Sequence, residues 1–173
     1  MKKTLSLLAL VLAVALCFCA CSGGNEVVKH YNSAADFAEI GISLDAPEGA
    51  SDTKYDVIET TFDEQALNIA QVTYNYNETA CTLRGANISS HNVSGYDENK
   101  AASEEEYDLN VEGFSSKIRV MQVDGKYVAI WFLGEQSYSL CAETDDPLVA
   151  TSCAMDAANA NIPAAAPVTQ ATP

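Results

Sequence analysis

The chain has 173 residues and a formal net charge of −15, because 24 Asp and Glu residues outnumber 9 Lys and Arg residues. This excess of acid argues against nucleic-acid binding, since phosphate recognition depends on clustered Lys and Arg, and against attachment to anionic lipid through charge. The length is typical of one domain with appended segments.

Residues 1–20 have the layout of an export signal. Lys2 and Lys3 precede an apolar run, Leu5–Leu16, and small residues and two glycines follow it. A positive start, an apolar centre and a small-residue end are typical of a secretory signal. A membrane span over Thr4–Ala20 is the competing interpretation, but a span needs about 20 apolar residues. We therefore expect residues 1–20 to be removed as a signal peptide.

The three cysteines at the end of this segment differ in the residue that precedes each of them. Cys17 and Cys19 follow bulky residues, and only Cys21 follows a small one, Ala20. The segment resembles a bacterial lipoprotein signal, which implies that Cys21 carries the lipid and begins the mature chain. It departs from that family at Phe18 and Cys19, where leucine and a small residue are usual. A zinc site is disfavoured, because paired zinc ligands are usually separated by two to four residues. A diacylglyceryl group has two acyl chains, which give stable anchoring.

The remaining chain divides by composition. Residues 21–30 contain Ser, two Gly and Asn directly after Cys21 and predict a flexible tether. Residues 31–159 alternate apolar and polar segments and predict one extracytoplasmic domain. Residues 160–173 are rich in Ala and Pro and carry no charge, which predicts a disordered tail.

The domain is predicted to begin with a short amphipathic helix. Ser33 and Asp36 form a capping-box-like start, Phe37 and Ile40 share one face, and Gly41 ends the helix. The alternating segments then predict strands over residues 55–62, 67–74, 78–84, 114–123, 126–133 and 137–142.

Two further segments complete the prediction. Residues 88–108 are polar and acidic and predict a long loop or an irregular sheet edge. Asp146 and Pro147 are typical of a helix start, and a helix is expected over residues 148–158. Short turns favour antiparallel pairing. The sequence therefore predicts the α+β class: a meandering antiparallel sheet of about six strands with two short helices packed on one face.

Several short motifs of this domain resemble a domain of unknown function that occurs in Gram-positive lipoproteins and in the extracytoplasmic parts of some anti-sigma factors. These motifs are Asn68–Tyr74, Ala80–Ala86, Val93–Asp97, Val128–Trp131 and Ser137–Leu140. The resemblance spans Ser33 to Ala158. It implies an extracytoplasmic α+β domain without established chemistry, and no active-site residue is transferred.

Three cysteines lie in the domain: Cys81, Cys141 and Cys153. An odd number leaves at least one thiol without a partner inside the chain. Cys141 ends a predicted strand and Cys153 lies in the next helix, so a returning helix would bring the two together. Their disulfide would close a loop of about a dozen residues, worth roughly 3 kcal/mol. Another pair, or three reduced thiols with Cys81 buried, are the open alternatives.

No catalytic residue, metal ligand or cofactor is predicted. Ser90, His91 and Asp97 are near in sequence, but a triad is defined by geometry, and the Gly-x-Ser-x-Gly motif is absent from the sequence. A thiol catalyst of Cys81 and His91 is disfavoured, because a strand cysteine facing a core is usually inert. Asp97 and Asn99 fit the first and third positions of a calcium-binding loop. The fifth position, which needs a ligand, and the sixth, which needs glycine, both hold alanine.

The strand over residues 126–133 supplies the candidate ligand surface. Alternation places Tyr127 and Trp131 on one face, and Val128 and Ile130 on the other. Aromatic residues on a central hairpin are more often part of the core, and that interpretation stays open. If the helices cover the Val128 face, however, Tyr127 and Trp131 lie on the open face and form the candidate ligand surface.

These observations predict a lipid-anchored lipoprotein on the extracytoplasmic face of the cell membrane, with a non-enzymatic domain that binds an unidentified ligand. The membrane is its expected partner through the lipid, and a membrane-protein or cell-surface partner is open. One alternative is a sensor or accessory subunit of a membrane protein complex. The other is a small surface hydrolase that uses the open face of the sheet.

Overall fold

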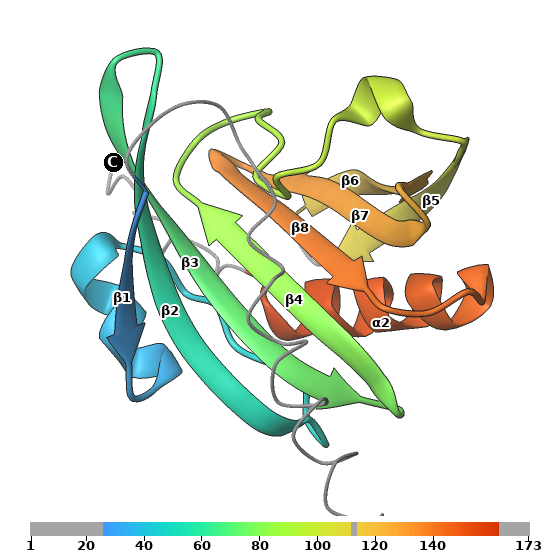
Figure 1. Cartoon of the computed structure of the whole chain (residues 1–173), viewed down its shortest axis with the longest axis horizontal. Helices are drawn as coiled ribbons and strands as arrows, with labels where there is room; N and C mark the ends of the chain where they lie inside the picture. Colours follow the sequence, from blue (N-terminus) through green and yellow to red (C-terminus); the bar gives the residue numbers. More distant parts are fainter. Residues whose placement is uncertain (1–25, 112–113, 163–173) are drawn as a thin grey trace, which may run out of the picture.

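The computed structural model describes residues 26–111 and 114–162 (Figure 1). The predicted signal peptide, the lipidation candidate Cys21 and most of the predicted tail lie outside the described residues. The domain therefore includes residues 26–30, which the sequence assigned to the tether.

The described part of the chain forms one eight-stranded antiparallel sheet, one α-helix and two short 3₁₀ helices. The strands are β1 (Val27–Tyr31), β2 (Ser51–Phe62), β3 (Gln65–Tyr76), β4 (Thr79–Ala86), β5 (Ser103–Val111), β6 (Phe114–Val123), β7 (Lys126–Leu133) and β8 (Gln136–Ala142). The helices are η2 (Ala34–Ile40), η3 (Glu98–Lys100) and α2 (Pro147–Ala160). The predicted α+β class with an antiparallel sheet is confirmed.

The sheet consists of two four-stranded meanders that meet in its centre. Its strand order is β1-β2-β3-β4-β8-β7-β6-β5, so the first meander ends on β4 and the second ends beside it on β8. In the β2–β3, β3–β4 and β6–β7 hairpins, both turn residues have positive φ, as at Asp124 and Gly125. Such turns match the twist of paired strands, and the predicted Asp-Gly hairpin is among them.

The two edge strands differ from the sequence prediction. β1 lies mostly in the predicted tether and pairs with β2, where Lys29 reaches Glu59 and His30 reaches Asp56, each at 2.5 Å. β5 overlaps the segment predicted as a loop or an irregular sheet edge; it does lie at the edge, but it is regular and pairs with β6 along its whole length. Each edge strand carries charge, which protects an exposed edge but hides the apolar alternation that identifies strands.

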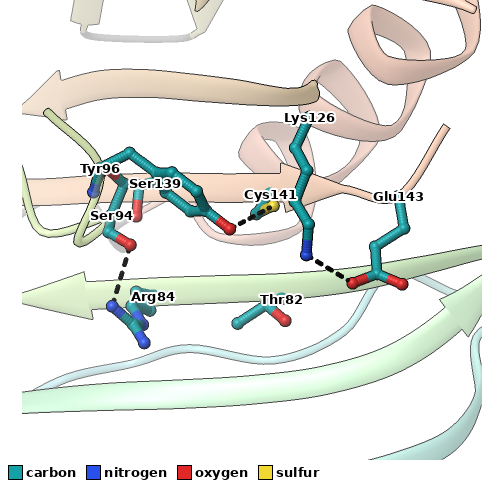
Figure 2. A pocket seen from close by; sticks show the side chains of 8 residues that line it. All are labelled: Thr82, Arg84, Ser94, Tyr96, Lys126, Ser139, Cys141 and Glu143. Carbon is teal, nitrogen blue, oxygen red and sulfur yellow. Dashed lines mark hydrogen bonds and ion pairs between the residues drawn. The ribbon is translucent and has the colours of Figure 1, made fainter. Parts of the chain in front are cut away.

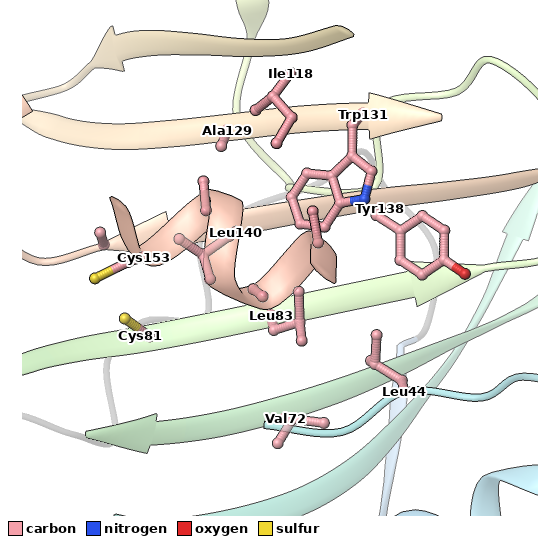
Figure 3. Close-up of a cluster of buried hydrophobic side chains, with 14 of the residues drawn as sticks. Leu44, Val72, Cys81, Leu83, Ile118, Ala129, Trp131, Tyr138, Leu140 and Cys153 are labelled. Carbon is pink, nitrogen blue, oxygen red and sulfur yellow. The ribbon is translucent and has the colours of Figure 1, made fainter. Parts of the chain in front are cut away.

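The main core lies between the sheet and α2 (Figure 3). Trp131 and Tyr138 stack there with ring centroids 5.6 Å apart, and both are buried. The buried face of α2 consists of alanines and Cys153, and small side chains let the helix approach the sheet closely. Phe37 of η2 joins the same core at the β1–β2 end.

The helix therefore covers the opposite face from the one expected. Trp131 is 0% exposed, and Tyr127 packs against the same core. The prediction that Tyr127 and Trp131 form an open ligand surface is wrong. Val128 and Ile130 face the other side, where residues between β4 and β5, including Tyr96, cover them.

Asn161, just after α2, links the helix end to the segment between η2 and β2. Its Oδ1 accepts from the Asp45 backbone N–H at 2.7 Å, and its Nδ2 donates to the Asp45 carbonyl at 2.8 Å. The same amide donates to the Ala157 carbonyl at 2.8 Å. Asn161 is buried, so this side chain satisfies backbone groups that water does not reach.

We predict that Asn161→Ala lowers the free energy of unfolding by about 2 kcal/mol, because buried polar groups lose their partners. Urea denaturation followed by circular dichroism measures this loss. Asn159 is exposed on the last turn of the same helix, and Asn159→Ala is expected to change stability by less than about 0.5 kcal/mol. Equal effects of the two substitutions would contradict the linking role of Asn161.

Candidate functional site

The face of the sheet opposite α2 is crossed by residues 87–102, here called the crossing segment. This segment runs from the end of β4 at the centre to β5 at the far edge (Figure 1). It covers the apolar residues of β6 and β7 on that face. The part of the same face over β2 and β3 lies beside the crossing segment, and the candidate site is there.

Arg84 holds the crossing segment to the sheet (Figure 2). It lies on β4, and strand alternation turns its side chain away from α2. Its Nη1 donates to the Ser94 carbonyl at 2.9 Å and to the Val93 carbonyl at 3.4 Å. Its Nε donates to Gln71 Oε1 on β3 at 2.9 Å. One guanidinium thus connects two strands with the segment that passes over them.

A second cluster of polar side chains lies under the crossing segment, around a cavity of about 30 Å³ (Figure 2). Lys126 Nζ contacts Glu143 Oε1 at 2.9 Å, and this hydrogen bond raises the pKa of Lys126. The Cys141 thiol donates to the Tyr96 hydroxyl at 3.6 Å. The cavity has room for a couple of water molecules and not for a substrate. We interpret these residues as support for the crossing segment.

A larger groove of about 500 Å³ lies between the β2–β3 hairpin and the crossing segment. Its floor is apolar: Ile58 of β2 pairs with Ile69 of β3, and Leu67 and Phe62 lie further along the same hairpin. All four side chains face away from α2 by strand alternation. A groove of this size with an apolar floor is typical of a binding site.

The rim of the groove is acidic. Glu26, before β1, and Asp97 and Glu98, at the start of η3, line it. Asp97 Oδ1 accepts from the Asn99 backbone N–H at 3.0 Å, and Glu98 forms an ion pair with Arg119 of β6. Glu26 and Asp97 are exposed, so their charges reach a ligand that enters the groove.

The structure does not assemble the serine triad considered above. The His91 ring packs on Phe62, with centroids 3.9 Å apart, at the end of the groove. Ser90 Oγ lies 3.5 Å from Ser89 Oγ, and Asp97 caps η3. Cys81 lies under α2, on the other side of the sheet from His91. The groove has apolar and acidic groups together with the Arg84 guanidinium, which Gln71 and the Ser94 carbonyl hold, and its imidazole serves packing.

The candidate Cys141–Cys153 disulfide is also wrong, and in the structure Cys81, Cys141 and Cys153 are all reduced. Cys141 pairs with Val128 of β7 and lies on its face of the sheet, under the crossing segment. Cys153 lies on the buried side of α2, on the opposite face. Cys81 is the cysteine that faces α2, and it lies beside Cys153 (Figure 3).

Neither a metal site nor a membrane span is found in the described ranges. No three His, Cys, Asp or Glu side chains gather there to hold a metal ion. No helix of residues 26–111 and 114–162 has both the length and the apolar character needed to cross a bilayer. No protein-family model matches the chain, and no curated protein or solved structure matches it either. The resemblance to the lipoprotein and anti-sigma domain thus stays a prediction.

We predict that Arg84→Met loosens the crossing segment, because the Val93 and Ser94 carbonyls lose a charged donor. Hydrogen exchange of the amides in residues 92–96 is expected to accelerate, and the free energy of unfolding to fall by about 2 kcal/mol. Lys117→Met is the control, since Lys117 pairs with Glu106 on the exposed surface, where a salt bridge contributes about 0–1 kcal/mol. Unchanged exchange in residues 92–96 would refute the role of Arg84.

Proposed function

We propose that this protein is a lipid-anchored lipoprotein on the extracytoplasmic face of the membrane, and that its groove binds a segment of a partner protein. The groove between the β2–β3 hairpin and the crossing segment carries the binding part of the proposal. The signal-like layout of residues 1–20 and the small residue before Cys21 support export and lipid attachment.

The chemistry of the groove favours a partner segment with apolar and basic side chains. Leu67 and Ile69 offer apolar surface in the floor above the buried Ile58, and Glu26 and Asp97 offer negative charge at the rim. The whole chain carries a net charge of −15, so long-range attraction also favours a basic partner. An extended segment with alternating apolar and basic residues presents both kinds of side chain at once.

The position of the groove suits a partner at the membrane. Glu26 lines the groove and lies five positions after Cys21. Five residues span at most about 18 Å when fully extended. Lipid on Cys21 would therefore keep the groove close to the bilayer surface, where extracytoplasmic segments of membrane proteins are found. This supports an accessory subunit as the form that the binding role takes.

A hydrolase has less support from the site. Acyl transfer requires a nucleophile with a base beside it. The groove contains hydroxyl groups at Thr60 and Thr61, but the His91 ring packs on Phe62. We therefore favour binding over catalysis for this groove.

The groove is tested with two synthetic ten-residue peptides, one of alternating Val and Lys and one of alternating Val and Glu. We predict that the domain binds the Lys peptide more tightly, measured by fluorescence anisotropy, and that raising the salt concentration from about 0.05 to about 0.5 M weakens binding. Ile69→Lys is expected to weaken binding at least about tenfold, since it places like charge in the floor.

Asn68→Lys is the matched control for this test. Asn68 precedes Ile69 on β3, is exposed and, by alternation, lies on the other face of the strand. The substitution Asn68→Lys adds the same charge to the chain as Ile69→Lys and is expected to leave peptide binding unchanged. Equal binding of the two peptides, or equal loss in the two variants, would contradict the proposed groove.

Lipid attachment is tested separately at Cys21. We predict that Cys21→Ser moves the protein from the membrane fraction to the soluble or unprocessed fraction, and removes the diacylglyceryl mass from its N-terminal peptide. Cys19→Ser is the matched control and is expected to leave the membrane association and the diacylglyceryl mass unchanged. A Cys21→Ser protein with unchanged mass and membrane association would refute the anchor but not the groove.

A further inference from the structure

Cys81 and Cys153 meet between the sheet and α2. Cys81 on β4 is 3% exposed and Cys153 on α2 is 1% exposed, and both belong to the main core. The two sulfur atoms point toward each other from the strand and the helix (Figure 3). Contact with Cys153 and burial raise the pKa of the Cys81 thiol. Two cysteines from distant parts of the sequence are thus brought into direct contact.

The surroundings of this pair are apolar and enclosed. Tyr74 lies opposite Cys81 in the β3–β4 register. Its buried hydroxyl has no hydrogen-bond partner within the described residues, and burial raises its pKa. With no metal-binding group in the described ranges, the pair is not part of a metal site there. Contact between two thiols is therefore the main polar interaction that the site offers.

We propose that Cys81 and Cys153 form a disulfide in the mature protein, linking α2 covalently to β4. The proposal rests on the extracytoplasmic location proposed above, because disulfides form and persist in oxidising compartments. Cys141 lies on the other face of the sheet and takes no part in the bond.

The oxidant that the reaction requires is a reactive disulfide, such as that of an exported thiol oxidase or glutathione disulfide. The Cys153 thiol loses its proton and attacks one sulfur of that disulfide, which forms a mixed disulfide and releases one thiolate. The Cys81 thiol then loses its proton and attacks the Cys153 sulfur, which releases the second thiolate. The two protons and two electrons lost by the cysteines convert the oxidant to two thiols.

Either cysteine can make the first attack, because the same bonds form and the same groups leave in both orders. The thiolate is the nucleophile in disulfide exchange. Because both thiols are buried in the folded domain, the exchange takes place before α2 docks on the sheet or when the helix opens locally.

The experiment uses the full chain refolded with glutathione disulfide and glutathione, which makes it independent of the lipid anchor. Among the three cysteines of the domain, non-reducing peptide mapping is expected to find one linked pair of peptides, carrying Cys81 and Cys153. The disulfide closes a loop of roughly 70 residues, and the chain-entropy model gives long loops the larger stabilisation. The melting temperature of the oxidised protein is expected to exceed that of the reduced protein by about 10 °C.

Three serine variants separate this disulfide from other pairs. Cys81→Ser and Cys153→Ser are expected to remove the linked peptides and the difference in melting temperature between oxidised and reduced protein. Cys141→Ser is expected to keep both the linked peptides and the difference in melting temperature. A linked peptide that contains Cys141, or oxidised and reduced proteins with equal melting temperatures, would overturn the proposal. If both variants fail to fold, peptide mapping of the wild-type chain still decides between the pairs.

Discussion

The pairing of β4 with β8 is the contact on which the rest of the structure depends. Each four-stranded meander forms from hairpins that are local in sequence, and α2 packs mainly on β6, β7 and β8 of the second meander. Pairing from Cys81 opposite Ala142 to Ala86 opposite Ser137 joins the two meanders into one sheet. On the α2 side, this pairing places Cys81 of the first meander beside the helix (Figure 3). On the other side, it holds the strands whose polar side chains support the crossing segment. A long-range contact of this kind closes a large loop, so the two meanders gain from forming first.

The choice of face for α2 explains which predictions failed. Local patterns on the sequence located most strands, the Asp124-Gly125 hairpin, the capped start of η2 and the start of α2. Alternation also sorted the side chains of β7 correctly into two faces, but both faces are apolar. A sequence of this kind does not tell which face receives the helix. Placing α2 on the wrong face exposes Trp131 and pairs Cys153 with Cys141, so the two errors have one cause. The small side chains of α2 favour the face with Trp131, because the large stacked rings of Trp131 and Tyr138 fill the space that alanines leave.

The groove could not have been predicted from the sequence for a different reason. Its floor comes from β2 and β3, its wall from the crossing segment, and one of its rim carboxylates from Glu26, which sequence composition assigned to a tether. Ile58 and Ile69 alternate like core residues, and no pattern distinguishes a side chain in a groove from one in a core. The signal that was available is Arg84, the one charged residue of β4. A charge at such a position requires partners, and those partners are the carbonyl groups of the crossing segment.

The proposed groove and the proposed disulfide are connected through β4. Arg84 and Cys81 lie three positions apart on this strand, on opposite faces of the sheet. A disulfide to Cys153 would fix one side of β4 to α2, while the Arg84 guanidinium fixes its other side to the wall of the groove. Binding of an extended segment loses less free energy when the groove is already ordered before the partner arrives. If the domain is exported and tethered as proposed, a covalent link beneath β4 would serve the groove above it, because it would keep the strand that carries Arg84 in place.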